Sequence, residues 1–509
     1  MVNYEQVQNQ LRVSYINTNG GISIETIPIP ESERFNWGYC SESDKNKDLR
    51  FRSHDNLPVK KIPVKTLNKY RVLEFINANT TKEFKSRIFA DNQPKKAFID
   101  IETQAEFGIP KISNPISEIR SNAIILDHKQ LLIQSLKPLT GTQKEQICTK
   151  IHEYLGNPKN YRKGFKPIDI KFDIKFKCYD YNEKSMIQDF FYDYYKRLSF
   201  VSGWNVLRFD IAYLNARGKF LGVDITKASN GSRTKENLNK MYNYSPPEKN
   251  KKKARTTIEL PLHKIVVDYL DVFVKYDTSV KVKENNKLDS IAYEVLGIQK
   301  YKFNDSLDVL YENDIVGYLT YNAIDSILTS AIDQKLKTIN TMMKICNKSG
   351  CQFIETMFTS VVIESIASKL HYDQNQVIIQ KPYKESSGGK KYSGGWVLEP
   401  KPGYFENVFV MDFRAMFPSI ICYGNIGIDT LVGEFINNEE IKTTTGQIIK
   451  YDKNLHTKLE PNVAYRKDRD SVLRSAIGYM LQGRIDAKLL GKELESEIEL
   501  LKRLKQNLN

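Results

Sequence analysis

Two carboxylates, Asp100 and Glu102, alternate with apolar residues in the short stretch AFIDIET. The period of two along a strand places both side chains on one face. Like charges side by side repel each other, and a divalent cation that prefers oxygen ligands, Mg²⁺ or Mn²⁺, removes that conflict. The alternative is that both carboxylates face solvent on an edge strand, and the short pattern alone does not decide between the two.

Further candidate residues follow along the chain. Asp210 comes directly before a helical pattern, and Asn205 stands five residues earlier. Tyr321 and Asp325 are four residues apart in a helical stretch, so they share a face. Taken singly, Asp210 is also a suitable helix cap, and Tyr321 with Asp325 could be an exposed pair.

Together, four acids and one tyrosine in this order predict a two-metal phosphodiester hydrolase. The set is Asp100, Glu102, Asp210, Tyr321 and Asp325. In such a site one cation generates hydroxide, the other stabilises the leaving oxygen, and the tyrosine orients the water. We therefore expect the four acids to bind metal ions.

A further acid, Asp412, lies in the apolar run VFVMDFRAMFPSII, which leads into a Pro-Ser turn. A carboxylate buried in such a run is costly without a partner or a metal ion. The nearby stretch KDRDS offers Asp468 and Asp470, but basic residues flank both, so we do not expect either to be that partner. Asp470 or Ser471 is better suited to cap the helix that follows.

The elements that must position these residues are of mixed type. Strand patterns occur in AFIDIET, SNAIILD and KIVVDYLDVFV, and near the start in LRVSYINTN and ISIETIPIP. Helical patterns occupy the cores of YDYYKRLSFVSGW and NDIVGYLTYNAIDSILTSAIDQKL and the last forty residues. The stretch YNYSPPEKNKKKARTT predicts an exposed loop whose lysines either contact phosphates or are merely solvated. The whole predicts a multidomain chain of α/β and α+β type.

The composition favours a polyanionic partner. The 509 residues carry a formal net charge of +15, with 40% hydrophobic and 27% charged residues. This balance indicates nucleic acid before a membrane surface, and a merely soluble basic protein is the plain alternative. We find no signal-peptide core and no run long enough for a membrane span, so we expect no membrane partner and a cytoplasmic protein, in the host cytoplasm if it is viral. The six scattered cysteines predict free thiols.

The motifs resemble those of a known enzyme family. The patterns DIE, N-x3-F-D and Y-x3-D are similar to the three exonuclease motifs of proofreading 3′→5′ exonucleases, which have an RNase H-like fold. Asp268 matches a recurrent strand aspartate of that fold and is expected to be structural. Downstream, the trio Tyr392, Gly394, Gly395 and the segment DFRAMFPSI resemble the family B DNA polymerases, above all the replicative polymerases of T-even-like phages.

On this resemblance, Asp412 binds the catalytic metal ions of the palm domain, and each of the two sites holds two ions of Mg²⁺ or Mn²⁺. Arg484 and Lys488 lie four residues apart, and the two cations on one helix face suit the incoming triphosphate; an exposed basic helix is the alternative. Phe417 would be the steric gate against a ribose 2′-hydroxyl. The implied nucleotide-binding set is Phe413, Ala415, Met416, Phe417, Arg484 and Lys488, and the implied DNA-binding set is Asn205, Tyr392, Gly394 and Gly395. Ala415 and Phe417 depart from the serine and tyrosine that are usual in the family.

The resemblance also implies a domain order. We expect an N-terminal domain over residues 1–95, joined by 337–380, then an exonuclease domain over 96–336, a partial palm over 381–465 and the first half of the fingers over 466–509. The family's second fingers helix, its second metal-binding Asp-Thr-Asp and its thumb have no counterpart in the sequence. We therefore expect the partner of Asp412 in a second chain.

The expected function is that of the N-terminal subunit of a split family B DNA polymerase with its own proofreading exonuclease. The implied partners are a DNA primer-template, a deoxynucleotide (dNTP) and the C-terminal polymerase chain, with a sliding clamp as a further candidate. Two alternatives are a free-standing 3′→5′ DNA exonuclease and a non-catalytic replisome DNA-binding protein. The motif around Asp412 and the pair Arg484 and Lys488 disfavour the first, since a nuclease alone has no use for them. The second requires the acids to be incidental.

Overall fold

The chain divides into two compact units in the computed structural model. The first unit comprises Met1–Ile29 and Thr80–Val362, and the second comprises Pro30–Asn79 and Ile363–Asn509. The structure describes residues 1–54, 57–106, 108, 110–168, 173–228, 241–244, 258–261, 263–277, 285–303, 305–379, 398–413, 415–459 and 462–507.

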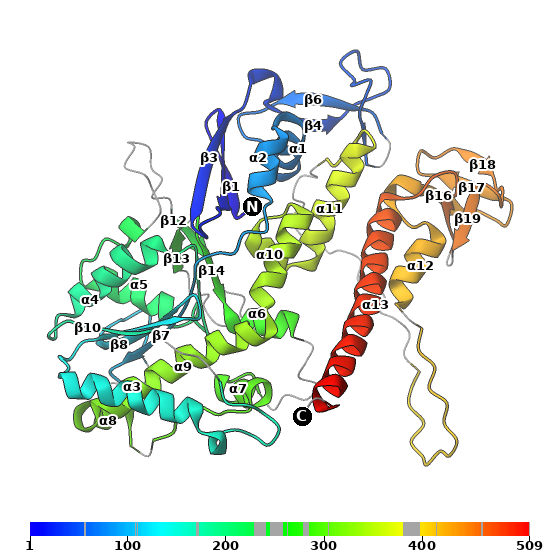
Figure 1. The fold of residues 1–509 in the computed structure, drawn as a ribbon. Helices are drawn as coiled ribbons and strands as arrows, with labels where there is room; N and C mark the ends of the chain where they lie inside the picture. Colours follow the sequence, from blue (N-terminus) through cyan, green and yellow to red (C-terminus); the bar gives the residue numbers. More distant parts are fainter. Residues whose placement is uncertain are drawn as a thin grey trace. The chain divides into compact units, whose positions relative to one another are not determined.

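A six-stranded mixed sheet forms the centre of the first unit (Figure 1). Its order is β10-β9-β8-β7-β11-β14, in which β8 is antiparallel to β7 and β9, and the other neighbours are parallel. The strands are β7 (Lys96–Thr103), β8 (Ile119–Leu126), β9 (Gln130–Ser135), β10 (Asp173–Cys178), β11 (Phe200–Gly203) and β14 (Ile265–Asp268). The strands predicted in AFIDIET and SNAIILD are confirmed.

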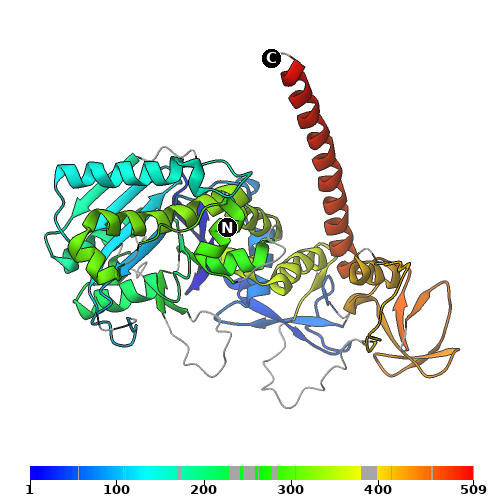
Figure 2. The same ribbon diagram turned by 90° about the horizontal axis from the view of Figure 1, so that it is seen from below.

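Helices cover both faces of this sheet (Figures 1 and 2). Successive residues of β7 point to opposite faces: Phe98 packs in the core shared with α3, α7 and α9, whereas Ala97 and Ile99 pack in the core shared with α4 and α5. A strand buried on both faces must be apolar almost throughout, so polar residues on β7 stand out. The helices are α3 (Gly141–Gly156), α4 (Glu183–Asp189), α5 (Asp210–Phe220), α7 (Leu288–Leu296) and α9 (Ile315–Leu336).

Smaller elements complete the first unit. A three-stranded antiparallel sheet of order β1-β2-β3 confirms the strands predicted near the start of the chain. The elements are β1 (Asn3–Val7), β2 (Gln10–Ile16), β3 (Ile22–Pro28), β12 (Met241–Tyr244), β13 (Ile258–Pro261), α2 (Lys82–Ile88), α6 (Tyr269–Tyr276), α8 (Leu307–Asn313) and α10 (Thr338–Ser349).

Two predictions of element type need correction. KIVVDYLDVFV is a strand only as far as Asp268, whose side chain accepts a hydrogen bond from the backbone N–H of Leu270 (3.0 Å) and so caps helix α6. In YDYYKRLSFVSGW the helical turns end at Arg197, and the strand β11 follows. Short apolar runs occur in both strands and helices, so their pattern alone does not distinguish the two. In KIVVDYLDVFV, the cap at Asp268 marks the point where the strand ends and the helix begins.

Within its described residues, the second unit contains short strand pairs, a five-stranded antiparallel sheet and four α-helices. The five-stranded sheet has the order β18-β17-β16-β20-β19. The strands are β4 (Phe35–Tyr39), β5 (Arg52–Ser53), β6 (Val59–Pro63), β15 (Gln376–Val377), β16 (Leu431–Phe435), β17 (Glu440–Thr443), β18 (Ile448–Lys450), β19 (His456–Leu459) and β20 (Val463–Arg466). The helices are α1 (Lys69–Asn79), α11 (Thr359–Asp373, which begins in the first unit), α12 (Met416–Gly424) and α13 (Val472–Asn507). Helix α13 confirms the helix predicted over the last forty residues.

The apolar run around Asp412 is exposed in the structure, although apolar composition usually favours burial. Residues 408–413 have no regular secondary structure, and their side chains are exposed, Met411 at 95%. Pro418 and Ser419 lie in the first turns of α12 rather than in a separate turn. A proline is tolerated there because the first N–H groups of a helix have no partner within it.

All six cysteines are free thiols, as predicted. None of the helices in the described part of the chain is both long and apolar enough to cross a membrane.

Candidate active site

Three of the predicted acids meet where α9 crosses the central sheet. Asp100 and Glu102 on β7 and Asp325 on α9 each place a carboxylate oxygen within 4.8 Å of the others. β7 lies between β8 and β11, so the alternative of an exposed edge strand does not apply. Because Asp100 and Glu102 share the face of Phe98, they point to the side that α9 covers.

Asp210 reaches the same strand from the start of α5. It is buried, and its Oδ1 accepts a hydrogen bond from the backbone N–H of Ile101 (3.0 Å), between the two acids of β7. Its side chain does not cap α5, whose N-cap residue is Phe209. Asp210 is therefore adjacent to the three-acid cluster, although it is not one of the three whose oxygens converge.

The electrostatics of the cluster are unfavourable for four ionised acids. Burial, followed by the charge of Asp325, raises the pKa of Asp100 well above its usual range. Burial likewise raises the pKa of Glu102 to about 8, that of Asp210 to about 7 and that of Asp325 to about 6. In each case the main cause is burial, which disfavours the ionised form of the acid.

Lys300 is a site residue that the sequence analysis missed. Its Nζ forms an ion pair with Asp325 and lies 3.3 Å from the hydroxyl oxygen of Tyr321. Burial disfavours the ammonium group, but Asp325 and Tyr321 outweigh burial and raise the pKa of Lys300, so it stays charged. The only local signal was the basic and aromatic stretch KYKF, which is not specific.

Tyr321 lies one turn before Asp325 and is half-buried. Its ring packs edge-to-face on Phe303, with the ring centroids 4.9 Å apart. Burial and the charge of Asp325 raise the pKa of Tyr321, so its hydroxyl keeps its proton and can donate a hydrogen bond.

Asn322 is a second site residue that the sequence analysis missed. It is fully buried on α9, and its Nδ2 donates to the backbone oxygen (3.0 Å) and to Oδ2 (2.8 Å) of Asp100. No periodicity marks an asparagine between Tyr321 and Asp325 as a contact of a strand more than two hundred residues earlier.

The donor set fits a divalent cation. The buried Oδ1 of Asp325 has no hydrogen-bond partner among the described residues. Carboxylate oxygens are the ligands that Mg²⁺ and Mn²⁺ prefer. One lysine cannot balance four acids, and a cation near the three converging oxygens would balance the remaining charge.

Asp268 and Asn205 shape the turn that leads to Asp210. Asp268 accepts hydrogen bonds from the backbone N–H of Asn205 (2.9 Å) and from Arg208 Nη1 (3.1 Å). Asn205 has a left-handed backbone, with φ of 67°. Asp268 therefore holds the turn through hydrogen bonds and does not belong to the converging three-acid cluster.

The site residues predicted for the polymerase half are mostly exposed. Asp412, Phe413, Met416 and Phe417 are exposed, Ala415 precedes α12 with φ of 51°, and Arg484 and Lys488 are exposed on α13. Tyr392, Gly394, Gly395 and the lysine run at 251–253 lie outside the described residues.

The two acids of KDRDS are engaged in ion pairs. Asp468 accepts two hydrogen bonds from Arg466, one of them from Nε at 2.9 Å. Oδ1 of Asp470 lies 3.4 Å from Nη1 of Arg474. Ser471 Oγ accepts a hydrogen bond from the backbone N–H of Arg474 (2.9 Å). Ser471 is therefore the capping residue of α13, one of the two candidates named from the sequence.

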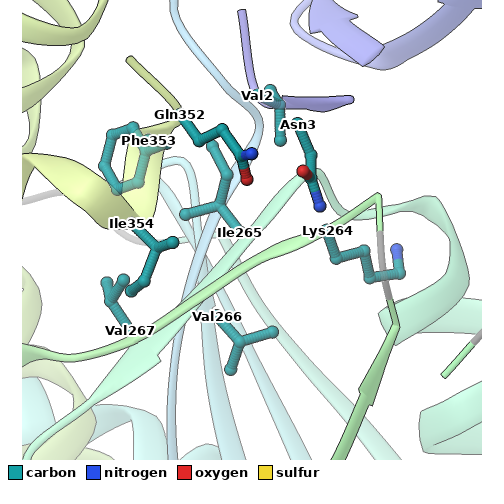
Figure 3. A pocket seen from close by; sticks show the side chains of 9 residues that line it. All are labelled: Val2, Asn3, Lys264, Ile265, Val266, Val267, Gln352, Phe353 and Ile354. Atoms are coloured by element: carbon teal, nitrogen blue, oxygen red, sulfur yellow. The ribbon is translucent and has the colours of Figure 1, made fainter. Parts of the chain in front are cut away.

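A small cavity at the edge of the central sheet is distinct from the acids (Figure 3). It measures about 30 Å³, enough for a water molecule, and β14 and the segment 352–354 supply much of its wall. The Nζ of Lys264 donates to the backbone oxygens of Lys196 (3.0 Å) and Leu198. The cavity is too small for a substrate, and the acids of β7 and α9 do not line it.

The known proteins that this chain resembles are DNA polymerases. Residues 353–506 match the family model described as DNA polymerase family B. The chain is 25% identical over 419 residues to the DNA-directed DNA polymerase of Escherichia phage RB69. The aligned region covers 79% of this chain and 44% of that protein.

Two further relatives carry similar names. The DNA-directed DNA polymerase of Enterobacteria phage T4 is 24% identical over 261 residues, 50% of this chain and 27% of that protein. DNA polymerase 1 of Sulfurisphaera ohwakuensis is 29% identical over 193 residues, 34% of this chain and 21% of that protein. The chain thus spans less than half the length of each of these three relatives.

Proposed function

The chain is a relative of the family B DNA polymerases, and on this premise we propose that it carries the proofreading 3′→5′ exonuclease of such an enzyme together with part of its polymerase site. The convergence of Asp100, Glu102 and Asp325 carries the exonuclease half of the proposal. The matched segment 353–506, which contains Asp412, Arg484 and Lys488, supports the polymerase half.

In the proposed exonuclease, the first unit is an RNase H-like domain and the acids of β7, α5 and α9 hold the metal ions. Asp100, Glu102 and Asp325 would be ligands, and Asp210 would complete the set. A bound divalent cation would activate water and stabilise the charge of the leaving oxygen. Tyr321 would orient the attacking water through its hydroxyl. Lys300 keeps that hydroxyl and Asp325 in place and supplies a fixed positive charge.

In the proposed polymerase, the second unit supplies part of the palm and the first fingers helix. Asp412 would bind metal, and Arg484 and Lys488 on α13 would bind the triphosphate of a dNTP. The exposure of the apolar residues around Asp412 supports the idea that further polypeptide covers them in the working enzyme. Our hypothesis is that a second chain supplies this part, with the second metal-binding carboxylate.

A free-standing 3′→5′ exonuclease is the second candidate. The four acids favour it, because all of them lie at the central sheet of the first unit. The match over residues 353–506 disfavours it, since a nuclease has no use for a polymerase segment.

The test is a combined degradation and extension assay. The purified chain is given labelled single-stranded DNA or a primer-template, with Mg²⁺ or EDTA and with or without dNTPs. We expect degradation in Mg²⁺ and no extension. Asp325→Ala should reduce the rate of degradation by more than about 100-fold. This loss is larger than the usual loss of activity when a residue that only supports a metal ligand is mutated.

Asp412→Ala is the matched control, because it removes an acid outside the exonuclease cluster and should leave degradation unchanged. Extension by this chain alone would contradict the proposal that the second palm carboxylate lies elsewhere. Absence of degradation by the wild type would contradict the exonuclease. Unchanged activity of a polymerase complex that contains the chain with Asp100→Ala and Asp210→Ala would favour a non-catalytic DNA-binding role.

A further inference from the structure

Asn322 links the first acid of β7 to the neighbouring strand. Its Nδ2 donates both to the backbone oxygen of Asp100 (3.0 Å) and to Oδ2 of the same residue (2.8 Å). Its Oδ1 accepts a hydrogen bond from Ser121 Oγ on β8 (2.9 Å). Ser121 pairs with Glu102 across the β7–β8 ladder, so Asn322 and Ser121 lie beside both acids of β7.

These contacts fix the orientation of the Asn322 amide. Both atoms that face its Nδ2 accept hydrogen bonds, and the hydroxyl that faces its Oδ1 donates one. If the amide turned over, its oxygen would face a carbonyl and a carboxylate, and its nitrogen would lose both acceptors. Asn322 and Ser121 are fully buried, so water cannot easily replace the lost bonds.

The amide therefore restrains the Asp100 carboxylate through one of its oxygens. Oδ2 of Asp100 accepts from Nδ2, and an oxygen of the same carboxylate lies within 4.8 Å of oxygens of Glu102 and Asp325. A carboxylate whose rotation is blocked loses less entropy when it binds a cation than one that rotates freely.

We propose that Asn322, oriented by Ser121, is a positioning residue that holds the Asp100 carboxylate for the metal ion. This inference rests on the proposed exonuclease, because the cation is the one assigned to that site. Outer groups that orient a ligand commonly change metal affinity or activity by about 10- to 100-fold when they are removed.

The same helix offers a matched control. Ser326 on α9 donates from Oγ to the backbone oxygen of Ala123 on β8 (2.8 Å), so it also joins the helix to the sheet. It is buried, like Asn322. Ser326→Ala removes a buried hydrogen bond between the same two elements, but it leaves Asp100 and its contacts unchanged.

The experiment measures Mn²⁺ binding to the full chain without DNA, from the electron paramagnetic resonance signal of free Mn²⁺. We expect Asn322→Ala to raise the dissociation constant about tenfold or more, Ser121→Ala to raise it less, and Ser326→Ala to leave it unchanged. Degradation of single-stranded DNA should need correspondingly more Mn²⁺ in the first two variants. If Asn322→Ala does not fold, Asn322→Ser replaces it, since serine is too short to reach Asp100.

Equal Mn²⁺ affinity of the Asn322 and Ser326 variants, with similar melting temperatures, would overturn the positioning role. A wild type that binds Mn²⁺ but degrades no DNA would contradict the proposed function, while the comparison of variants would still decide the role of Asn322. A wild type without saturable Mn²⁺ binding would overturn both.

Discussion

At the scale of single residues, the main feature is a group of acids that the fold holds together at a cost. Asp100, Glu102 and Asp325 converge, and Asp210 bonds to the strand between the first two. Their raised pKa values show that a protein without metal must either protonate them or tolerate their repulsion. Such strain is common where side chains are arranged for function rather than for stability.

The first prediction concerns the pH dependence of stability. A folded-state pKa above the unfolded value favours folding only while the acid is protonated, so this contribution is complete below about pH 4 and is lost as the pH rises. The loss should extend through the values of about 6 for Asp325, about 7 for Asp210 and about 8 for Glu102. In EDTA, we expect the melting temperature to fall by about 5 °C or more between about pH 5.5 and 8.5.

Saturating Mn²⁺ should remove most of this fall, because the cation binds the ionised acids and stabilises the folded state. Asp325→Asn is the control, since it keeps the shape of the side chain and removes one charge. It should show a smaller fall in EDTA and a weaker response to Mn²⁺. The same fall with and without Mn²⁺ would show that the acids do not bind the metal.

At the scale of elements, the start of α13 is defined by a local hydrogen-bond network. Ser471 Oγ accepts from Arg474 N (2.9 Å), and Asn425 Oδ1 accepts from Ser471 N (2.8 Å). Asn425 also donates to the backbone oxygens of Arg466 (2.6 Å) and Arg469 (2.7 Å). These bonds satisfy backbone groups that would otherwise lack partners at the junction of β20 and α13.

The second prediction concerns this cap. Ser471→Ala should destabilise the second unit by about 1 kcal/mol, because the first turn of α13 loses a side-chain acceptor. The measurement is the free energy of unfolding from denaturant titration. Ser475→Ala lies one turn into the same helix and should be neutral or slightly stabilising, since alanine favours helix interiors. Equal losses in both variants would show that capping is not the cause.

At the scale of the whole molecule, the charge balance bears on DNA binding. The net charge of +15 provides a long-range attraction for a polyanion.

The third prediction follows from that charge. In EDTA, which prevents degradation, the chain should bind single-stranded DNA with an affinity that falls about 300-fold between about 50 and 200 mM salt, if about six phosphates are neutralised. Fluorescence anisotropy of a labelled oligonucleotide measures this. Asp325→Ala should show the same dependence on salt, and an affinity that does not change with salt would contradict electrostatic binding.

The sequence by itself determined features that depend on local spacing. The alternation in AFIDIET was enough to place Asp100 and Glu102 on one face of a strand, and helical spacing was enough to place Tyr321 and Asp325 one turn apart. A cap at Asp470 or Ser471 and the helix α13 were also predictable, because capping and helix formation depend on neighbours within a few residues; the structure selects Ser471.

Only the tertiary structure decided which distant residues join the acids. Lys300 and Asn322 reach the site because loop and helix pack on the sheet, and neither residue carries a local pattern. The tertiary structure also decided that the apolar residues around Asp412 are exposed in this chain, whereas their composition predicts burial. The physical reason is that burial and side-chain contacts depend on which surfaces meet in three dimensions, while strand and helix periodicity depend on the local backbone alone.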